Sequence, residues 1–415
     1  MLAHSPPLPL TIDYGSEDGI TAGDEEGIFL ALEQRHRVRH LRLVFPVQNL
    51  PTLVIAIDEE FPILEYLIVD TRMKDSTVLV LPETLQAPNL RHLMLRGFAC
   101  PIRFRLHPTA VDLVTLCLVT SHPSAFFRPN ILLQWISFMP QLETLDIRFT
   151  FAVPNRDVER QLAQTPITTP ITLPNLRLFW FRGVSAYLEA VVCRIAAPRL
   201  EKLGIRLFKQ FTFSVPCLPQ FMNTTENLRF DNAKIVFKDK FMDVRMFSHE
   251  ADTYAFGVWV DCCHLDWQVS SVAQISNALS QAFSSVEYLT LEHEVHSQSS
   301  EEHNDVDRIE WRNLLLSFRN VKTLRIKDGL VEKLSHCLRL EEGELLLAML
   351  PELQELIYSG SREVGIFASF ITGRWSAGRP VRLIRDGPSP SSSQLSFEPP
   401  AITSPGDEAG TGVET

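Results

Sequence analysis

The residues of this sequence whose types could bind a metal ion form two clusters of histidine and cysteine. In the first, His293 and His296 enclose Glu294, and His303 and Asp305 follow downstream. The two leading histidines are three residues apart, whereas a helical zinc site of the usual kind needs a spacing of four. Because the segment also runs into a polar stretch, we interpret it as a solvated acidic loop.

The second cluster consists of the adjacent residues Cys262, Cys263 and His264. Neighbouring side chains point to opposite faces of a strand, so they could not hold one ion together there. We expect Cys262 to lie in the core and Cys263 to face the other way. The sequence thus predicts neither a metal site nor a cofactor.

Motifs that position a nucleophile or a phosphate group are missing from the sequence. It contains no Gly-x-Ser-x-Gly, no Gly-x-x-x-x-Gly-Lys and no Gly-x-Gly-x-x-Gly, and such loops are what would place the reacting groups. We therefore predict that the protein is not an enzyme. A hydrolase within the irregular region 207–262 is an alternative to that prediction.

Composition describes a soluble folded chain. Of 415 residues, 45% are hydrophobic and 21% are charged, and no run of apolar residues reaches the about 18 that a membrane helix needs. The net charge of -11 disfavours nucleic acid as the partner. Seven cysteines without a Cys-x-x-Cys pair, behind a start that lacks a secretory leader, indicate reduced thiols in the cytoplasm and/or nucleus.

The elements that must position any functional residue come from a repeated apolar pattern. Each copy has an aliphatic residue, two variable ones, an apolar residue, a variable one and a further apolar one. Ten clear copies start at Val38, Leu64, Leu90, Leu113, Leu142, Leu176, Leu200, Val286, Val321 and Leu353. Two weaker copies at Thr225 and Cys262 fill the long gap, and the starts then lie 23 to 37 residues apart.

Between the copies, the segments 185–195, 272–283 and 306–316 space apolar residues three and four apart, which predicts amphipathic helices. Several copies follow a proline by two residues, and we expect that proline to end the returning helix. Stacked strand-and-helix units predict an α/β leucine-rich-repeat solenoid, with a curved parallel sheet on the concave face and helices and loops on the convex face. An ordinary α/β domain is the alternative.

Composition also divides the chain into three parts. Residues 1–27 are acidic, so we expect a loosely ordered segment there. Residues 28–385 would hold about 12 repeats. Residues 386–415 are rich in Ser, Pro and Gly, which predicts a disordered tail.

Side chains alternate along a strand, so the variable positions of each copy should face the open side of the sheet. Arginine follows the last apolar residue in four of the five copies from the third to the seventh. Guanidinium groups match carboxylate or phosphate oxygens in pairs. The candidate protein-binding residues are His92, Met94, Arg96, Arg148, Trp180, Arg182 and Arg206. In the alternative interpretation, the arginines are solvated and paired with Asp146 and other local acids.

Three segments carry a resemblance to a known family: 37–43, 265–274 and 283–291. They resemble the leucine-rich-repeat proteins of mushroom-forming fungi that are usually described as F-box proteins, and the likeness extends from about residue 28 to 385. It implies a substrate receptor of a ubiquitin ligase, with an F-box that docks on the Skp1 adaptor. We find no F-box ahead of the first repeat, and Leu81-Pro82-Glu83 lies between repeats, so adaptor docking is in doubt.

We therefore expect a solenoid that binds a protein partner, with an acidic or phosphorylated partner as the hypothesis and with neither nucleic acid nor membrane as a partner. The resemblance implies a substrate receptor, or a relative that lacks adaptor docking. A scaffold protein without a link to ubiquitin ligation is the alternative.

Overall fold

The structure is a computed structural model. It describes residues 8–15, 21–45, 56–71, 79–80, 85–99, 110–151, 170–208, 213, 215–225, 227–248, 253–294, 308–327, 329–339, 349–359 and 365–386.

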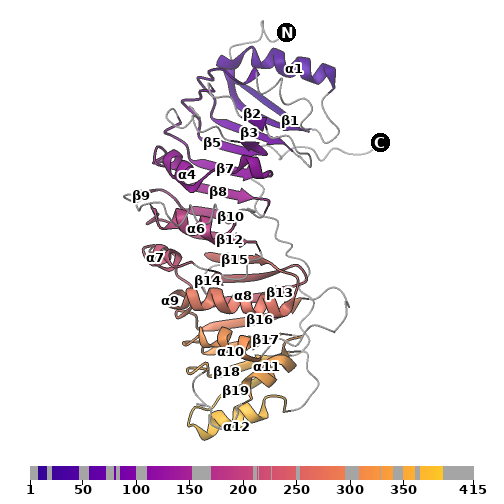
Figure 1. The fold of residues 1–415 in the computed structure, drawn as a ribbon, viewed down its shortest axis with the longest axis vertical. Coiled ribbons are helices and arrows are strands. Elements are labelled where there is room, and N and C mark those ends of the chain that lie inside the picture. Colours follow the sequence, from indigo (N-terminus) through magenta and orange to yellow (C-terminus); the bar gives the residue numbers. More distant parts are fainter. Residues whose placement is uncertain are drawn as a thin grey trace.

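One long sheet runs along the molecule from end to end (Figure 1). It has 15 strands, and neighbouring strands mostly follow one another in the sequence. Their order across the sheet is β1 (Leu10–Gly15), β2 (Val38–Phe45), β3 (Tyr66–Thr71), β5 (His92–Arg96), β7 (Thr115–Thr120), β8 (Thr144–Phe149), β10 (Leu178–Gly183), β12 (Lys202–Leu207), β15 (Phe256–Asp261), β14 (Phe241–Phe247), β13 (Asn232–Lys238), β16 (Tyr288–Glu294), β17 (Thr323–Ile326), β18 (Glu355–Tyr358) and β19 (Arg382–Arg385).

Every strand of this sheet except β14 runs in the same direction. Each of the ten clear copies of the apolar pattern contributes one strand. The aliphatic residues of these strands and the apolar faces of the helices form one continuous core. The predicted fold class, an α/β leucine-rich-repeat solenoid, is therefore confirmed. Two short pairs of strands lie beside the main sheet: β4 (Leu79–Val80) with β6 (Phe98–Ala99), and β9 (Ile171–Thr172) with β11 (Ile195–Ala196).

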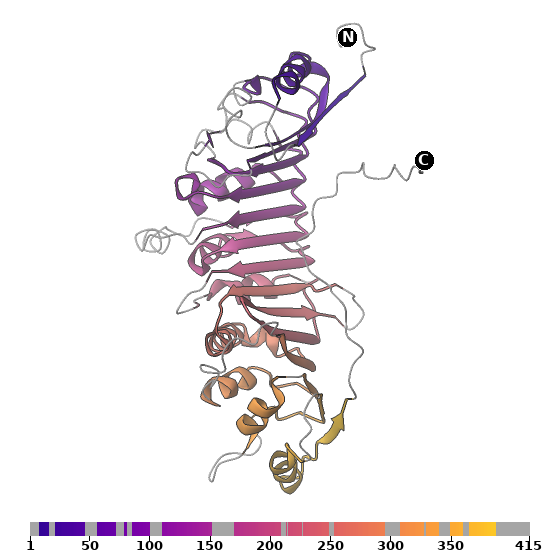
Figure 2. The same cartoon turned by 90° about the vertical axis from the view of Figure 1, so that its right-hand side faces the viewer.

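The helices that return the chain from one strand to the next are visible along one flank of the sheet (Figure 2). The described α-helices are α1 (Ala22–Leu32), α4 (Pro129–Ile136), α6 (Ser185–Val192), α7 (Cys217–Asn223), α8 (Leu265–Ala278), α9 (Ser280–Phe283), α10 (Arg308–Leu316), α11 (Val331–Leu338) and α12 (Ala368–Ser376), and two 3-10 helices cover Arg35–Arg37 and Pro123–Ala125. The three predicted amphipathic segments correspond to α6, to α8 with α9, and to α10. Among the described residues, no helix is long and apolar enough to cross a bilayer.

The prolines that precede the copies have a more specific role than the one predicted. In the copy that starts at Leu142, the Leu142 amide donates to the Met139 carbonyl at 3.1 Å, so Pro140 is the second residue of a four-residue turn. The amide of Leu200 bonds in the same way to the carbonyl of Ala197. Proline suits this position because its ring fixes φ near the value that the turn requires. These prolines thus set the turn before a strand.

The two weak copies were wrong as strands. Residues from Leu265 onward form α8, where Leu265, Val269 and Val272 recur on the buried face of the helix. The copy at Thr225 precedes β13. The long gap holds three strands whose order is reversed, because β15 pairs with β12 while β13 pairs with β16. The antiparallel strand β14 lies between them.

Part of the segment 1–27, which we expected to be loosely ordered, is structured. Strand β1 pairs with β2, and its alternate side chains Leu10, Ile12 and Tyr14 pack against the core. Helix α1 starts with a capping box between Thr21 and Asp24. The alternating apolar residues of β1 explain why this part is ordered, although the segment as a whole is acidic. The expected tail, apart from Asp386, lies outside the described residues.

Candidate protein-binding face

We call the side of the sheet opposite the main core the open face. Strand register aligns its side chains in rows that cross neighbouring strands, which lie about 4.8 Å apart. One row, the arginine row, contains Arg96 on β5, Arg148 on β8, Arg182 on β10 and Arg206 on β12, with Val119 on β7 between the first two. The last three are direct neighbours in register. The structure therefore places the four predicted arginines in one row.

The first two arginines each have their own carboxylate. Arg96 lies 3.4 Å from Asp70 on the preceding strand. Arg148 donates two hydrogen bonds to Asp146, from Nε to Oδ1 at 2.8 Å and from Nη2 to Oδ2 at 2.6 Å. Burial raises the pKa of Asp146, although the charge of Arg148 opposes that shift. This fork uses both oxygens of the carboxylate, and it matches the alternative interpretation, in which Asp146 pairs with an arginine of the row.

Arg182 and Arg206 share a single carboxylate, that of Asp261 at the end of β15. Arg206 donates from Nε at 3.0 Å and from Nη2 at 2.7 Å to the same oxygen. Arg182 reaches the other oxygen at 3.5 Å. Burial, and then the charge of Arg206, lower the pKa of Arg182. This end of the row therefore carries more positive than negative charge.

Trp180 lies beside the arginine row in a small aromatic cluster with Tyr254 and Trp259, separate from the main core. Its ring stacks on that of Trp259 at a centroid distance of 5.3 Å. Only 8% of Trp180 is exposed. Trp180 therefore lies on the open face, where it was predicted. Its ring packs within the protein, however, and offers little surface to a partner.

Two glycines make room for the indole rings. A Cβ atom on Gly204 would lie 2.5 Å from the ring of Trp180, and one on Gly257 would lie 2.4 Å from that of Trp259. The two glycines are register partners on β12 and β15. The rings can therefore lie flat against the sheet.

His92 and Met94 lie on the open face at β5, apart from the aromatic cluster, because β7 and β8 separate β5 from β10. The ring of His92 packs on that of Tyr66, with centroids 5.5 Å apart, and its Nδ1 lies 3.1 Å from the hydroxyl of Thr115. Burial, and then the charge of Arg91, lower the pKa of His92. The seven predicted residues thus share the open face and divide into two groups along it. The first group is His92, Met94 and Arg96 on β5, and the second is Arg148, Trp180, Arg182 and Arg206 on β8, β10 and β12.

Sequence reasoning missed several residues around the second group. Lys202 places Nζ 4.2 Å from the ring centroid of Tyr254, and no described carboxylate forms an ion pair with it. Burial, and then the charge of Arg245, lower the pKa of Lys202. Trp259 and Asp261 belong to β15 and Tyr254 precedes that strand, in a region where the repeat pattern gave no register. Lys202 could have been found, because it occupies a variable position of the seventh clear copy.

Comparisons with known proteins give no family. No protein-family model matches the sequence, and neither does any curated protein. The chain is similar to a solved structure, the leucine-rich repeat-containing protein LegL7 from Legionella pneumophila, at 12% sequence identity and a TM-score of 0.31. That similarity covers 87% of this chain and 97% of the other. The strand order and register of the chain itself define its fold.

The two clusters considered for metal binding fall only partly within the described residues. No group of three or more histidine, cysteine or acidic side chains that could hold a metal is found among the described residues. Cys262 is buried and Cys263 is exposed, in the link between β15 and α8. Of the first cluster, His296, His303 and Asp305 lie outside the described residues.

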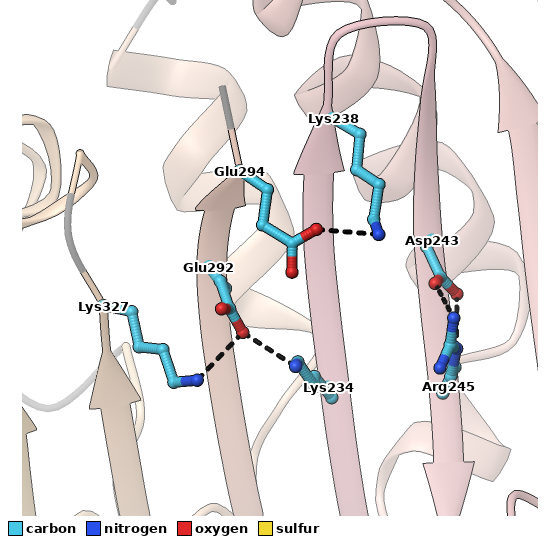
Figure 3. A network of polar contacts seen from close by, with 7 residues as sticks. All are labelled: Lys234, Lys238, Asp243, Arg245, Glu292, Glu294 and Lys327. Carbon is cyan, nitrogen blue, oxygen red and sulfur yellow. Dashed lines mark hydrogen bonds and ion pairs between the residues drawn. The ribbon is translucent and has the colours of Figure 1, made fainter. Parts of the chain in front are cut away.

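Across the reversed strand β13 and its neighbour β16, the open face carries a network of lysines and glutamates (Figure 3). Glu292 on β16 lies 2.8 Å from Lys234 and 3.1 Å from Lys327. Glu294 pairs with Lys238 at 2.7 Å. Burial disfavours the charge of Glu292, but hydrogen bonds and charges from Lys234 and Lys327 outweigh it and lower the pKa of Glu292.

The lowered pKa predicts a pH-dependent contribution of Glu292 to stability. A carboxyl with a lower pKa in the folded state stabilises the fold above its unfolded pKa and loses that contribution as the pH falls through the folded value. We expect Glu292→Gln to lower the free energy of unfolding by about 1 kcal/mol at pH 7. Urea unfolding of both proteins between pH 7 and pH 3 should show this difference disappear at the acid end.

Glu201→Gln provides the control, since Glu201 pairs with Arg177 where both side chains are more than half exposed. It should leave stability unchanged at every pH, because exposed pairs contribute little. A Glu292→Gln difference that persists at pH 3 would contradict the assignment of the effect to this carboxylate.

Proposed function

We propose that this chain is a protein-binding solenoid, and that the open face contacts an acidic or phosphorylated segment of its partner. The observation that carries the proposal is the end of the arginine row, where Arg182 and Arg206 share one carboxylate. The whole chain has a net charge of -11, so a locally cationic stretch departs from the bulk charge. Complementary charge favours association and the choice of partner.

The proposed contact residues are the arginine row together with His92 and Met94. Trp180 lies beside the row, with its ring buried in the aromatic cluster. A partner would cross several strands, because the row spans β5 to β12. An extended repeat sheet provides a surface of this shape.

The finer role that we propose is that of a substrate receptor in ubiquitin ligation, or of a relative that binds without adaptor docking, acting in the cytoplasm and/or nucleus and without catalysis of its own. Its support is the resemblance of segments 37–43, 265–274 and 283–291 to F-box and leucine-rich-repeat proteins of fungi. The second candidate is a leucine-rich-repeat scaffold without a ligase link. Co-purification with a Skp1-type adaptor tests the ligase link, since a docking substrate receptor predicts capture, whereas the relative without adaptor docking and the scaffold both predict none.

Reversing the charge of the row tests the binding face. We expect the variant Arg148→Glu, Arg182→Glu and Arg206→Glu to weaken capture of the partner about 100-fold or more, because attraction becomes repulsion at three adjacent positions. Quantitative affinity capture from the native cell extract, followed by titration of the protein that is lost, measures the change. The corresponding glutamine variant removes the charges without placing a new acid beside Asp146.

The matched control reverses three arginines outside the open face: Arg177, Arg199 and Arg379. They lie outside the helices and strands, and their reversal produces the same change in net charge. If this control lost the partner to the same extent, or if the row variants kept it while remaining folded by circular dichroism, the open face would not be the binding surface.

A further inference from the structure

The carboxylate of Asp261 occupies the place where an anion from a partner would bind to Arg182 and Arg206. It ends β15 and lies beside β12, because the reversed strands bring these two segments together. Arg206 donates twice to Oδ1, and Arg182 lies 3.5 Å from Oδ2. The protein therefore supplies its own ligand to a two-guanidinium site.

This internal ligand does not satisfy the site fully. The two guanidinium groups carry one charge more than the carboxylate. The Nε atom of Arg182 is buried and has no hydrogen-bond partner in the described structure. Arg148 next to it adds a third guanidinium to the row, but both oxygens of Asp146 already hold that group.

The two guanidinium groups have supports other than Asp261. Arg182 lies over the ring of Phe208 at 5.6 Å, and Arg206 lies over the ring of Phe241 at 5.7 Å. Such contacts hold a cation in place without using its N–H donors. The side chain of Asp261 is 28% exposed, so it can move toward solvent while the arginines stay oriented.

We propose that Asp261 is a built-in competitor at this site, and that it makes the site select a phosphoryl group over a carboxylate. This inference rests on the proposed function and names its ligand. A carboxylate from a partner offers the same oxygens as Asp261 but must be brought from solution, whereas Asp261 is tethered at a high effective concentration. A phosphoryl group carries about -1.5 to -2 charges and three acceptor oxygens. It can therefore bind both guanidinium groups and displace the tethered carboxylate.

The test uses the full chain and three sets of degenerate seven-residue peptides with a central phosphoserine, glutamate or serine, each with a fluorescent label. Fluorescence anisotropy gives their affinities for the unmodified protein and for Asp261→Asn. For the unmodified protein we expect phosphoserine peptides to bind about tenfold or more tightly than glutamate peptides. In Asp261→Asn we expect glutamate peptides to gain about tenfold, so that the preference for phosphoserine falls below about threefold.

Two further variants make the outcomes distinct. Glu201→Gln removes one negative charge at an exposed pair outside the site, and it should change none of the affinities. The double variant Arg182→Gln and Arg206→Gln should lose the phosphoserine peptides. Circular dichroism and thermal unfolding verify that each variant is folded.

If Asp261→Asn leaves both affinities and their ratio unchanged while the double arginine variant loses binding, the competitor role of Asp261 is wrong and the binding face stands. If the double arginine variant binds phosphoserine peptides as the unmodified protein does, the anion site itself is wrong. If neither the unmodified protein nor Asp261→Asn binds any peptide, the selection of a phosphoryl group is likewise overturned.

Discussion

Gly204→Val is expected to lower the free energy of unfolding by about 3 kcal/mol, because the new side chain would occupy the space of the Trp180 ring. A Cβ atom at this position already lies 2.5 Å from two ring carbons. The indole would have to leave its stack on Trp259 and expose its surface to water. Chemical unfolding followed by circular dichroism and by tryptophan fluorescence measures both consequences.

Two companion variants test this explanation of the Gly204→Val result. Gly23→Ala in α1, where nothing lies within 4 Å of the added atom, should keep or slightly raise stability. The pair Gly204→Val with Trp180→Ala should cost less than the sum of the two single changes, because each removes part of the other's effect. Additive costs would mean that the ring of Trp180 does not lie over Gly204.

The second large effect concerns Asp243 on β14, whose side chain is only 1% exposed. It accepts from Arg245 at 3.1 Å and 2.5 Å. Burial raises the pKa of Asp243, and it outweighs the favourable charge of Arg245. We expect Asp243→Val to destabilise the protein by about 3 kcal/mol, since the carboxylate that holds the guanidinium is removed from a buried position.

Adding Arg245→Met to Asp243→Val should recover most of that loss. A buried ion pair offsets the cost of its own desolvation only partly, so an apolar pair of similar size is often as stable. The four unfolding curves of the double-mutant cycle give the coupling energy. A double variant as unstable as the single one would show that Arg245 is not what makes the loss of Asp243 costly.

The sequence could predict the regular part of this architecture because each unit repeats the same local chemistry. In the copies at Leu142, Leu176 and Leu200, the apolar pattern indicates which side chains are buried. The strand register then follows, because equivalent positions of successive copies align when the units stack. The row of Arg148, Arg182 and Arg206 was predictable for that reason. Only the alternation of side chains along a strand was needed.

The reversed strands could not be placed in the same way. Ile235, Val244 and Val258 are buried as the alternating pattern of a strand requires, yet β13, β14 and β15 lack the leading aliphatic residue that marks the other units. Their spatial order depends on pairing between distant segments, such as Leu203 with Phe256. The contact of Asp261 with the arginines follows from that pairing, so local sequence carried no sign of it.

The reversal also affects how the molecule is assembled during synthesis. From β1 to β12, each new strand can join the edge left by the one before it, so the growing stack can lengthen as the chain emerges from the ribosome. At β12 this growth stops, because the next strand to appear, β13, lies three places further along the sheet, beyond the positions of β15 and β14. The hairpin of β13 and β14 must form apart from the stack until β15 emerges and joins the two blocks.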